Sequence, residues 1–255
     1  LFSAALSTLV AAAFFAALVA RRCGAAALLR RPAAWQDILL TSLYIGVAFH
    51  SLFFIGLRFT TAGNAAILLL LEVFFSFLIL GLILRHEPMR PRQLLGAFLM
   101  VAGAAVVLLP NVSGLRWGDF LVVLATAFGP LGNKHAQAAR KSSTAEEIMF
   151  WRSMISGCVL LVLACGFESW PSGAGLCDSF WYLAVNGVLI FGLSKILWIE
   201  GIHLIPITIA ISLLSVSPVF TLAAAYFALE EPVTVFQVCG LPFLGAGVIM
   251  LTKKT

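Results

Sequence analysis

Apolar runs of about twenty residues recur along the whole chain and are separated by short polar links. A helix needs about 20 apolar residues to cross the hydrocarbon core of a bilayer. By this rule the sequence predicts nine membrane-spanning helices, at residues 1–20, 38–57, 62–84, 93–110, 117–137, 147–167, 179–200, 204–229 and 234–252. The chain is therefore predicted to be an all-α polytopic membrane protein.

The charged residues support this class and predict an orientation. They make up 11% of the 255 residues, against about 25% in soluble domains. Most Lys and Arg occur in alternate links, so the net charge of +5 is expected to set topology and not to bind nucleic acid. The links that carry them, with the C-terminus, are predicted to be cytoplasmic; the residues are Arg21, Arg22, Arg30, Arg31, Arg85, Arg90, Arg92, Arg140, Lys141, Arg152, Lys253 and Lys254.

An internal repeat relates the two halves of the chain. A shift of 144 residues superimposes an acidic residue followed by proline, and then two glycines: Glu87-Pro88 on Glu231-Pro232, Gly96 on Gly240 and Gly103 on Gly247. Repeats in membrane transporters are often inverted, with the site at their interface. The matched links RHEPMRPR and LEEPVTVF differ in charge, as links on opposite membrane faces would. The sequence thus predicts two inverted repeats, residues 1–110 and 117–252.

The first repeat is expected to lack one helix. Residue 1 is a leucine inside an apolar run, and the repeat leaves the span at 117–137 without a counterpart. We therefore expect ten spans in the complete protein, as two sets of five, with the first span missing here.

These patterns together resemble one known group of proteins. The stretches 56–109 and 198–251 carry most of the likeness, joined by WGDFLVVLATAFGPLGNK and EEIMFWRSMISGCVLLVLA. They are similar to the EamA-type members of the drug/metabolite transporter superfamily. The resemblance implies a bacterial inner-membrane carrier that moves small organic metabolites by alternating access, mainly outward, through a cavity between the repeats.

Two charged residues within predicted spans are the main site candidates. Glu72 lies near the middle of its span, where it could titrate a proton or bind an amine, or could be a structural carboxyl group. Lys195 could bind a substrate carboxylate or pair with Glu72, or its long side chain could reach the membrane interface. One acid and one base within the spans favour a zwitterion such as an amino acid, and export of amino acids or related compounds is the predicted function.

The other cavity candidates are His50, Phe54, Asn186, Trp198 and Ser215, with Pro218 as a hinge. His50 could relay protons, which would couple transport to a proton gradient. Trp198 lies one helical turn from Lys195 and could stack on a ligand, and Phe54 occupies the matching place in the first half. Packing alone could also explain these side chains. Asn133, His135 and Glu200 are expected to anchor helix ends, and Glu231 is expected to cap the helix after Pro232.

Several chemistries have no motif in this sequence. A P-loop, an H-E-x-x-H motif and a G-x-S-x-G motif are absent, and the five cysteines show no metal-ligand spacing. No cofactor, metal site or enzyme activity is therefore predicted. Two alternatives remain open: a sugar-phosphate or nucleotide-sugar exchanger, which would need several cationic residues in its cavity, and a membrane scaffold. Homo-oligomers are also left open.

Overall fold

The computed structural model describes residues 1–84, 91–108, 116–168, 173–214 and 217–252. A few of the predictions above fall outside these ranges. They concern Glu87, the charges of Arg85, Arg90, Lys253 and Lys254, and the cavity candidate Ser215.

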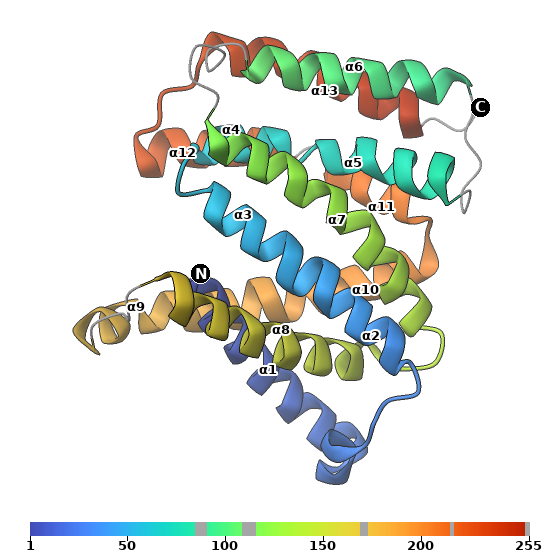
Figure 1. The fold of residues 1–255 in the computed structure, drawn as a ribbon, viewed down its shortest axis with the longest axis vertical. Coiled ribbons are helices and arrows are strands. Elements are labelled where there is room, and N and C mark those ends of the chain that lie inside the picture. The colour runs from blue at the N-terminus through green and yellow to red at the C-terminus, as the bar shows by residue number, and fades with distance from the viewer. Residues whose placement is uncertain (85–90, 109–115, 169–172, 215–216, 253–255) are drawn as a thin grey trace. The chain divides into compact units, whose positions relative to one another are not determined.

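Helices make up most of the described residues, and those residues contain no strand (Figure 1). The predicted all-helical class is therefore confirmed for this part of the chain. Within it, five helices are long and apolar enough to cross a membrane: Phe2–Arg22, Trp35–Gly56, Ala62–Ile83, Ala145–Phe167 and Ser179–Leu204. Shorter apolar helices cover Leu95–Val107, Phe220–Leu229 and Val235–Met250. The number of membrane crossings remains a prediction.

The chain forms two compact units, and each takes segments from both halves of the sequence. Unit 1 comprises Leu1–Ser51 and Gly132–Ile205, and unit 2 comprises Leu52–Leu131 and Pro206–Thr255. The chain passes from one unit to the other inside α3 (His50–Gly56), inside α7 (Trp117–Ala139) and after Ile205. The compact units are thus distinct from the two predicted repeats.

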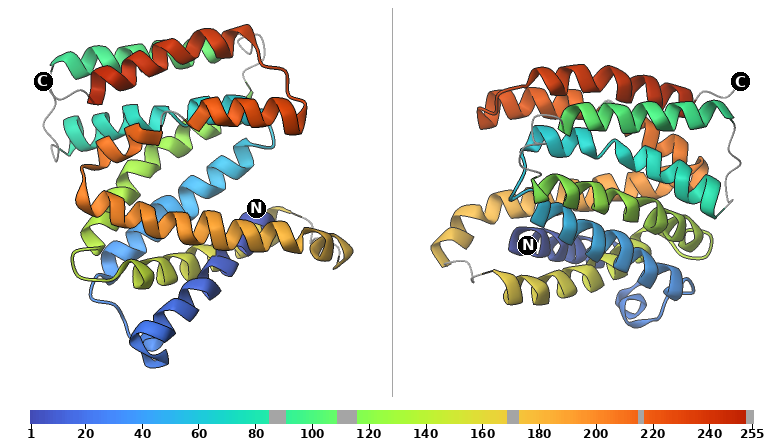
Figure 2. Two further views of the ribbon diagram at one scale, coloured as in Figure 1. Left: turned by 180° about the vertical axis from the view of Figure 1, so that it is seen from behind. Right: turned by 45° about the horizontal axis from the view of Figure 1, so that its top comes forward.

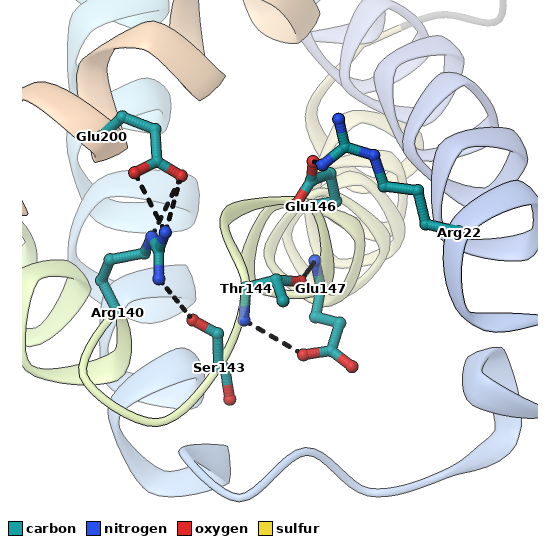
Figure 3. A network of polar contacts seen from close by, with 7 residues as sticks. All are labelled: Arg22, Arg140, Ser143, Thr144, Glu146, Glu147 and Glu200. Carbon is teal, nitrogen blue, oxygen red and sulfur yellow. Dashed lines mark hydrogen bonds and ion pairs between the residues drawn. The ribbon is translucent and has the colours of Figure 1, made fainter.

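Unit 1 is organised around α1 (Phe2–Cys23) and α8 (Ala145–Phe167), which pack along their lengths in antiparallel directions. The Phe2 N–H donates to the Glu168 carboxylate at 2.9 Å near one end, and Arg22 pairs with Glu146 near the other (Figure 3). The remaining elements of unit 1 are η1 (Ala25–Leu29), α2 (Trp35–Thr41), η2 (Ser42–Phe49), α9 (Gly173–Val185), η5 (Asn186–Leu193) and α10 (Ser194–Leu204). Both η2 and η5 are π-helical, and their bounds differ by 144 residues.

A capping box begins α8. The Thr144 hydroxyl accepts from the Glu147 N–H at 3.3 Å, and the Glu147 carboxylate accepts from the Thr144 N–H at 3.1 Å (Figure 3).

Loss of such a cap typically costs about 1 kcal/mol. Thr144→Ala is therefore expected to lower the free energy of unfolding, measured in detergent, by about that amount. Thr144→Ser keeps the hydroxyl and is expected to unfold like the wild type; an equal loss in both variants would contradict the capping role.

Unit 2 is organised around a second antiparallel pair, α6 (Pro91–Leu108) and α13 (Val235–Thr252), which lie side by side (Figures 1 and 2). Glycines allow their backbones to approach closely. A Cβ added at Gly103 would lie 3.0 Å from the Gly240 carbonyl oxygen, and one at Gly247 would lie 2.7 Å from that of Gly96. Small residues commonly permit such contacts between membrane helices. The other elements of unit 2 are α4 (Ala62–Leu68), α5 (Leu71–Ser76), η3 (Phe77–Ile83), α11 (Ile207–Leu213) and α12 (Ser217–Leu229).

Polar groups tie α4 to the C-terminal part of unit 2. The Gln237 side-chain amide donates to the Asn64 carbonyl oxygen at 2.7 Å, and both side chains are buried. The Glu231 carboxylate accepts from the Ala62 and Gly63 N–H groups at 3.1 and 3.2 Å. Glu231 therefore caps the first turn of α4, where a negative charge is stabilised, and not the helix after Pro232 as the sequence suggested.

Candidate functional site

Three titratable side chains of unit 1 line one small cavity. His50 begins α3, directly after η2; Arg152 lies in α8; and Lys195 is the second residue of α10, directly after η5. We call these three residues the basic cluster. Six uncharged residues complete the cavity lining: Thr8, Gly46, Met149, Ser153, Ser156 and Phe191. The two π-helices and α8 thus bring together residues that lie far apart in the sequence.

Arg152 is the most deeply buried member of the cluster. Its exposed fraction is 5%, and its Nη1 donates to the Met149 sulfur at 3.6 Å. The assignment of Arg152 to a cytoplasmic link was therefore wrong, because α8 begins at Ala145 and places residue 152 two turns inside the helix. The prediction of a single base within the spans was also wrong, because Arg152 is a second cationic residue inside a helix. Burying a charge in this way is costly unless it is compensated.

His50 is also buried, and its ring has a fixed orientation. Its Nδ1 bonds to the Ile45 carbonyl oxygen, and its ring centroid lies 5.3 Å from that of Phe191. A carbonyl oxygen can only accept, so Nδ1 carries a proton. The structure therefore brings two predicted site residues, His50 and Lys195, to the same cavity. Proton relay by His50 stays a prediction.

The end of α7 connects to α10 through a separate set of polar contacts. The Trp198 indole N–H donates to the Asn133 carbonyl oxygen at 3.0 Å, and Asn133 is buried. Arg140 donates from Nε and Nη2 to the two Glu200 carboxylate oxygens, each at 3.1 Å (Figure 3). His135 bonds to Asp37 at 2.8 Å. Trp198 is thus held by α7, and its ligand-stacking role stays a prediction.

In unit 2, the predicted site residue Glu72 lies in α5 against α7. A Cβ added at Gly129 would collide with the Glu72 carboxyl group, so the absence of a side chain there makes room for the carboxylate. Pro130 follows in α7 and lacks the N–H that would bond to the Thr126 carbonyl. Near Glu72, Leu68, Leu71 and Val122 belong to one buried apolar core. The structure therefore places the Glu72 carboxyl group against α7 at Gly129.

The remaining candidates have separate environments. The Asn186 amide donates to the Ser7 hydroxyl at 3.2 Å, and Asn186 lines an open surface groove together with Trp181 and Tyr182. Phe54 lies in unit 2 and packs edge-on against Phe53, with ring centroids 5.7 Å apart. The described part of the predicted span 204–229 includes α11 and α12, and Pro218 lies in α12. A hinge at this residue stays a prediction.

Sequence reasoning missed Arg152 and Gly129. Arg152 stands only five residues after Glu147, close enough to the polar start of the helix to resemble a loop charge. The pattern of polar residues in α8 could have revealed it, because Arg152, Ser153 and Ser156 are all buried. Gly129 carries no signal of its own, since its importance comes from the carboxylate that α5 places against it.

An all-helical chain with several apolar helices and ionisable residues within them is an integral, multi-pass membrane protein. Comparison with family models gives the class more closely. The chain belongs to the EamA-like transporter family, whose model matches residues 1–109 and 116–253. The predicted family is therefore confirmed, and the chain is a membrane transporter of the drug/metabolite type.

Curated relatives support the same class. The Bacillus subtilis protein named uncharacterized transporter YoaV is 22% identical over 221 residues, which are 85% of this chain and 75% of that protein. YyaM of the same organism, also named an uncharacterized transporter, is 27% identical over 218 residues, 80% of this chain and 69% of that protein. An uncharacterized transporter of Methanothermobacter thermautotrophicus is 29% identical over 231 residues, with 84% of this chain and 62% of that protein covered.

A solved structure supports the fold. One crystal structure of a protein 18% identical to this chain matches it with a TM-score of 0.69, over 98% of this chain and 86% of the other.

Proposed function

We propose that this protein is an alternating-access carrier of a small organic solute, built from two inverted repeats at residues 1–110 and 117–252. The observation that carries the proposal is the packing of α6 against α13. Gly96 and Gly103 of α6 lie 144 residues before Gly240 and Gly247 of α13, the same offset as in the sequence repeat. The two helices run antiparallel, which is expected when equivalent helices belong to repeats of opposite orientation.

The contacts of this pair are reciprocal. Added at Gly103, a Cβ would meet Leu244 and the Gly240 carbonyl; added at Gly247, it would meet Met100 and the Gly96 carbonyl. Each residue of the first set is 144 positions from one residue of the second set: Gly103 from Gly247, Met100 from Leu244, and Gly96 from Gly240. The same offset relates η2 to η5 in unit 1, where α1 and α8 also run antiparallel. These relations support the inverted arrangement of the two proposed repeats.

The proposed solute is an amino acid or a related compound, exported across a bacterial inner membrane by a protein whose C-terminus is cytoplasmic. In this proposal Glu72 and Lys195 recognise or gate the charged ends of the solute. His50 assists proton coupling, and Phe54 with Trp198 gives apolar contacts. Asn186, Ser215 and the hinge at Pro218 complete the proposed pathway.

One observation favours a second candidate function, an exchanger of phosphorylated or other anionic metabolites. An anion carrier needs several cationic side chains inside the protein, and the basic cluster supplies Arg152 together with Lys195. Among the described residues that line the cavity there is no carboxylate. A solute with a net negative charge would therefore be attracted to this site.

Transport by the full-length protein in proteoliposomes tests the proposal. A panel of labelled amino acids is assayed for uptake and counterflow, with and without an imposed pH gradient. We expect saturable counterflow of at least one member, and loss of that transport in Glu72→Gln with normal insertion. Unchanged transport in Glu72→Gln would remove the carboxylate from the mechanism. Movement of phosphorylated metabolites without movement of amino acids would replace the first candidate with the second.

A further inference from the structure

We propose that the segment joining α1 to α2 is a binding surface for anionic phospholipids, formed by four arginines and one exposed leucine. The arginines occur as two pairs, Arg21 with Arg22 and Arg30 with Arg31, and Leu29 lies between the pairs. We call these five residues the arginine link. This inference goes beyond the proposed function, because it depends on neither the solute nor its transport.

The first argument is the place of the arginine link relative to the membrane. It joins two helices that are long and apolar enough to cross a bilayer, Phe2–Arg22 and Trp35–Gly56. A link between two membrane helices lies at the membrane surface, within reach of the lipid headgroups. Trp35 also packs edge-on against Trp151 of α8, with ring centroids 5.2 Å apart, and tryptophan is enriched at this level of membrane proteins. Lipid phosphates are therefore close to these arginines.

The second argument is the charge of the arginine link. All four of its arginines are exposed. The Arg31 guanidinium lies over the Trp35 ring, 5.4 Å from the ring centroid. Within the described part of the chain, Arg21 and Arg30 have no ion pair. Like charges in so short a segment repel each other, and an anionic surface relieves that repulsion.

The carboxylates near the arginine link are already engaged within the protein. Glu146 pairs with Arg22, and Asp37 bonds to His135 at 2.8 Å (Figure 3 shows the first pair). Glu147 accepts from a backbone N–H in the capping box of α8. These acidic groups leave two arginines of the link for an anion from outside the protein.

The segment joining α7 to α8 adds a further cation to this surface. The Ala34 N–H donates to the Ser143 hydroxyl at 3.4 Å, so this segment lies against the end of the arginine link. Lys141, two residues before Ser143, is exposed. The positive surface therefore extends beyond the arginine link itself.

The third argument is the exposed leucine, which indicates a lipid and not a soluble anion. Leu29 ends η1, and its exposed fraction is 90%. At the boundary between headgroups and acyl chains this side chain leaves water while the neighbouring arginines stay among the phosphates. An anionic phospholipid offers both surroundings at once. A soluble phosphate offers only the charge.

Thermal unfolding of the purified full-length protein in a neutral detergent tests this surface without a transport assay. Phosphatidylglycerol is titrated as the probe, and phosphatidylcholine with the same acyl chains is its zwitterionic counterpart. We expect phosphatidylglycerol to raise the unfolding temperature in a saturable way, with an apparent affinity at least about fivefold higher than that of phosphatidylcholine. Salt screens exposed charges, so this preference should shrink as the salt concentration rises. Equal affinities for the two lipids, or a preference that salt does not change, would overturn the proposal.

Soluble anions distinguish a lipid from other partners. Glycerol 3-phosphate carries the phosphate without acyl chains, and polyglutamate stands for an acidic protein. We expect neither to change the unfolding temperature at the concentrations where phosphatidylglycerol acts. A response to glycerol 3-phosphate or to polyglutamate that equals the lipid response would overturn the assignment to phospholipids.

Substitutions then assign the binding to residues. The double variant Arg21→Gln with Arg30→Gln is expected to weaken the apparent affinity for phosphatidylglycerol at least about tenfold, because each basic residue near an anionic surface contributes about fivefold. Arg21→Lys with Arg30→Lys keeps both charges and should bind like the wild type. Arg58→Gln with Arg116→Gln removes two exposed arginines from other links and serves as the matched control, which should also bind like the wild type. Equal losses in the two glutamine variants would show that only net charge matters and would overturn the proposal.

A variant of the leucine keeps every charge and therefore the charge pattern that directs insertion. Leu29→Ser is expected to weaken the apparent affinity for both lipids by the same factor, and to leave the preference for phosphatidylglycerol unchanged. Without lipid it should unfold like the wild type, because exposed side chains contribute little to stability. Wild-type affinity for both lipids in Leu29→Ser would remove the leucine from the surface and contradict the third argument.

Discussion

Gly247→Leu is expected to destabilise the protein by about 3 kcal/mol, the upper end of the cost of overpacking a well-packed interior. Already the first atom of a side chain at this position would lie 2.5 Å from Met100 Cγ and 2.7 Å from the Gly96 carbonyl oxygen. The backbone of α6 cannot move aside without losing its other contacts with α13. The free energy of unfolding in detergent, or the unfolding temperature, measures the effect.

Two further variants make this prediction specific. Gly245 lies on the same helix, and a Cβ there would meet nothing within 4 Å, so Gly245→Leu is expected to unfold like the wild type. Gly103→Leu is expected to match the loss in Gly247→Leu, because a Cβ at Gly103 would lie 2.8 Å from Leu244 and 3.0 Å from the Gly240 carbonyl. Equal losses in Gly245→Leu and Gly247→Leu would show that close helix packing is not the cause.

Gly129→Ala is expected to reduce transport about tenfold or more while leaving the stability of the fold nearly unchanged. The added methyl group would occupy the place of the Glu72 carboxyl group and push it aside. A small displacement of a group that acts in the mechanism can cost one to two orders of magnitude in rate. Stability should change little, because the end of a side chain can move and alanine is favourable inside a helix. Counterflow of the solute found in the proteoliposome panel measures the effect.

Gly201→Ala is the matched control for the added methyl group. A Cβ at Gly201 would meet nothing within 4 Å, so its counterflow is expected to equal that of the wild type. Normal transport by Gly129→Ala would mean that the position of the Glu72 carboxylate does not matter, and Glu72 would then be a structural residue.

The helices could be predicted from sequence because each one depends on a local signal. Runs of about 20 apolar residues define α1 and α8, and the helix at Trp35–Gly56 lies close to its predicted range of 38–57. The predicted span 204–229 contains α11 and α12, and residues 215–216 between them lie outside the described residues. The sequence also gave no sign that each compact unit would combine segments from both halves, since that depends on contacts between distant helices.

The candidate site was predicted in part. His50 and Lys195 stand out as ionisable residues inside apolar runs, and the structure places both at one cavity. Arg152 was counted with the charges of the preceding link, although the predicted span 147–167 already contained it. Asn133 lies within two turns of the end of α7, and its burial and its bond to Trp198 depend on contacts between distant helices.

The reciprocal glycines of α6 and α13 also limit how the two halves of this chain can diverge. Gly96 faces Gly247, and Gly103 faces Gly240, so each contact takes one residue from the first half and one from the second. A larger residue at any of these positions must be accommodated in the opposite half. Substitutions in residues 91–108 and 235–252 are therefore coupled through these glycine contacts.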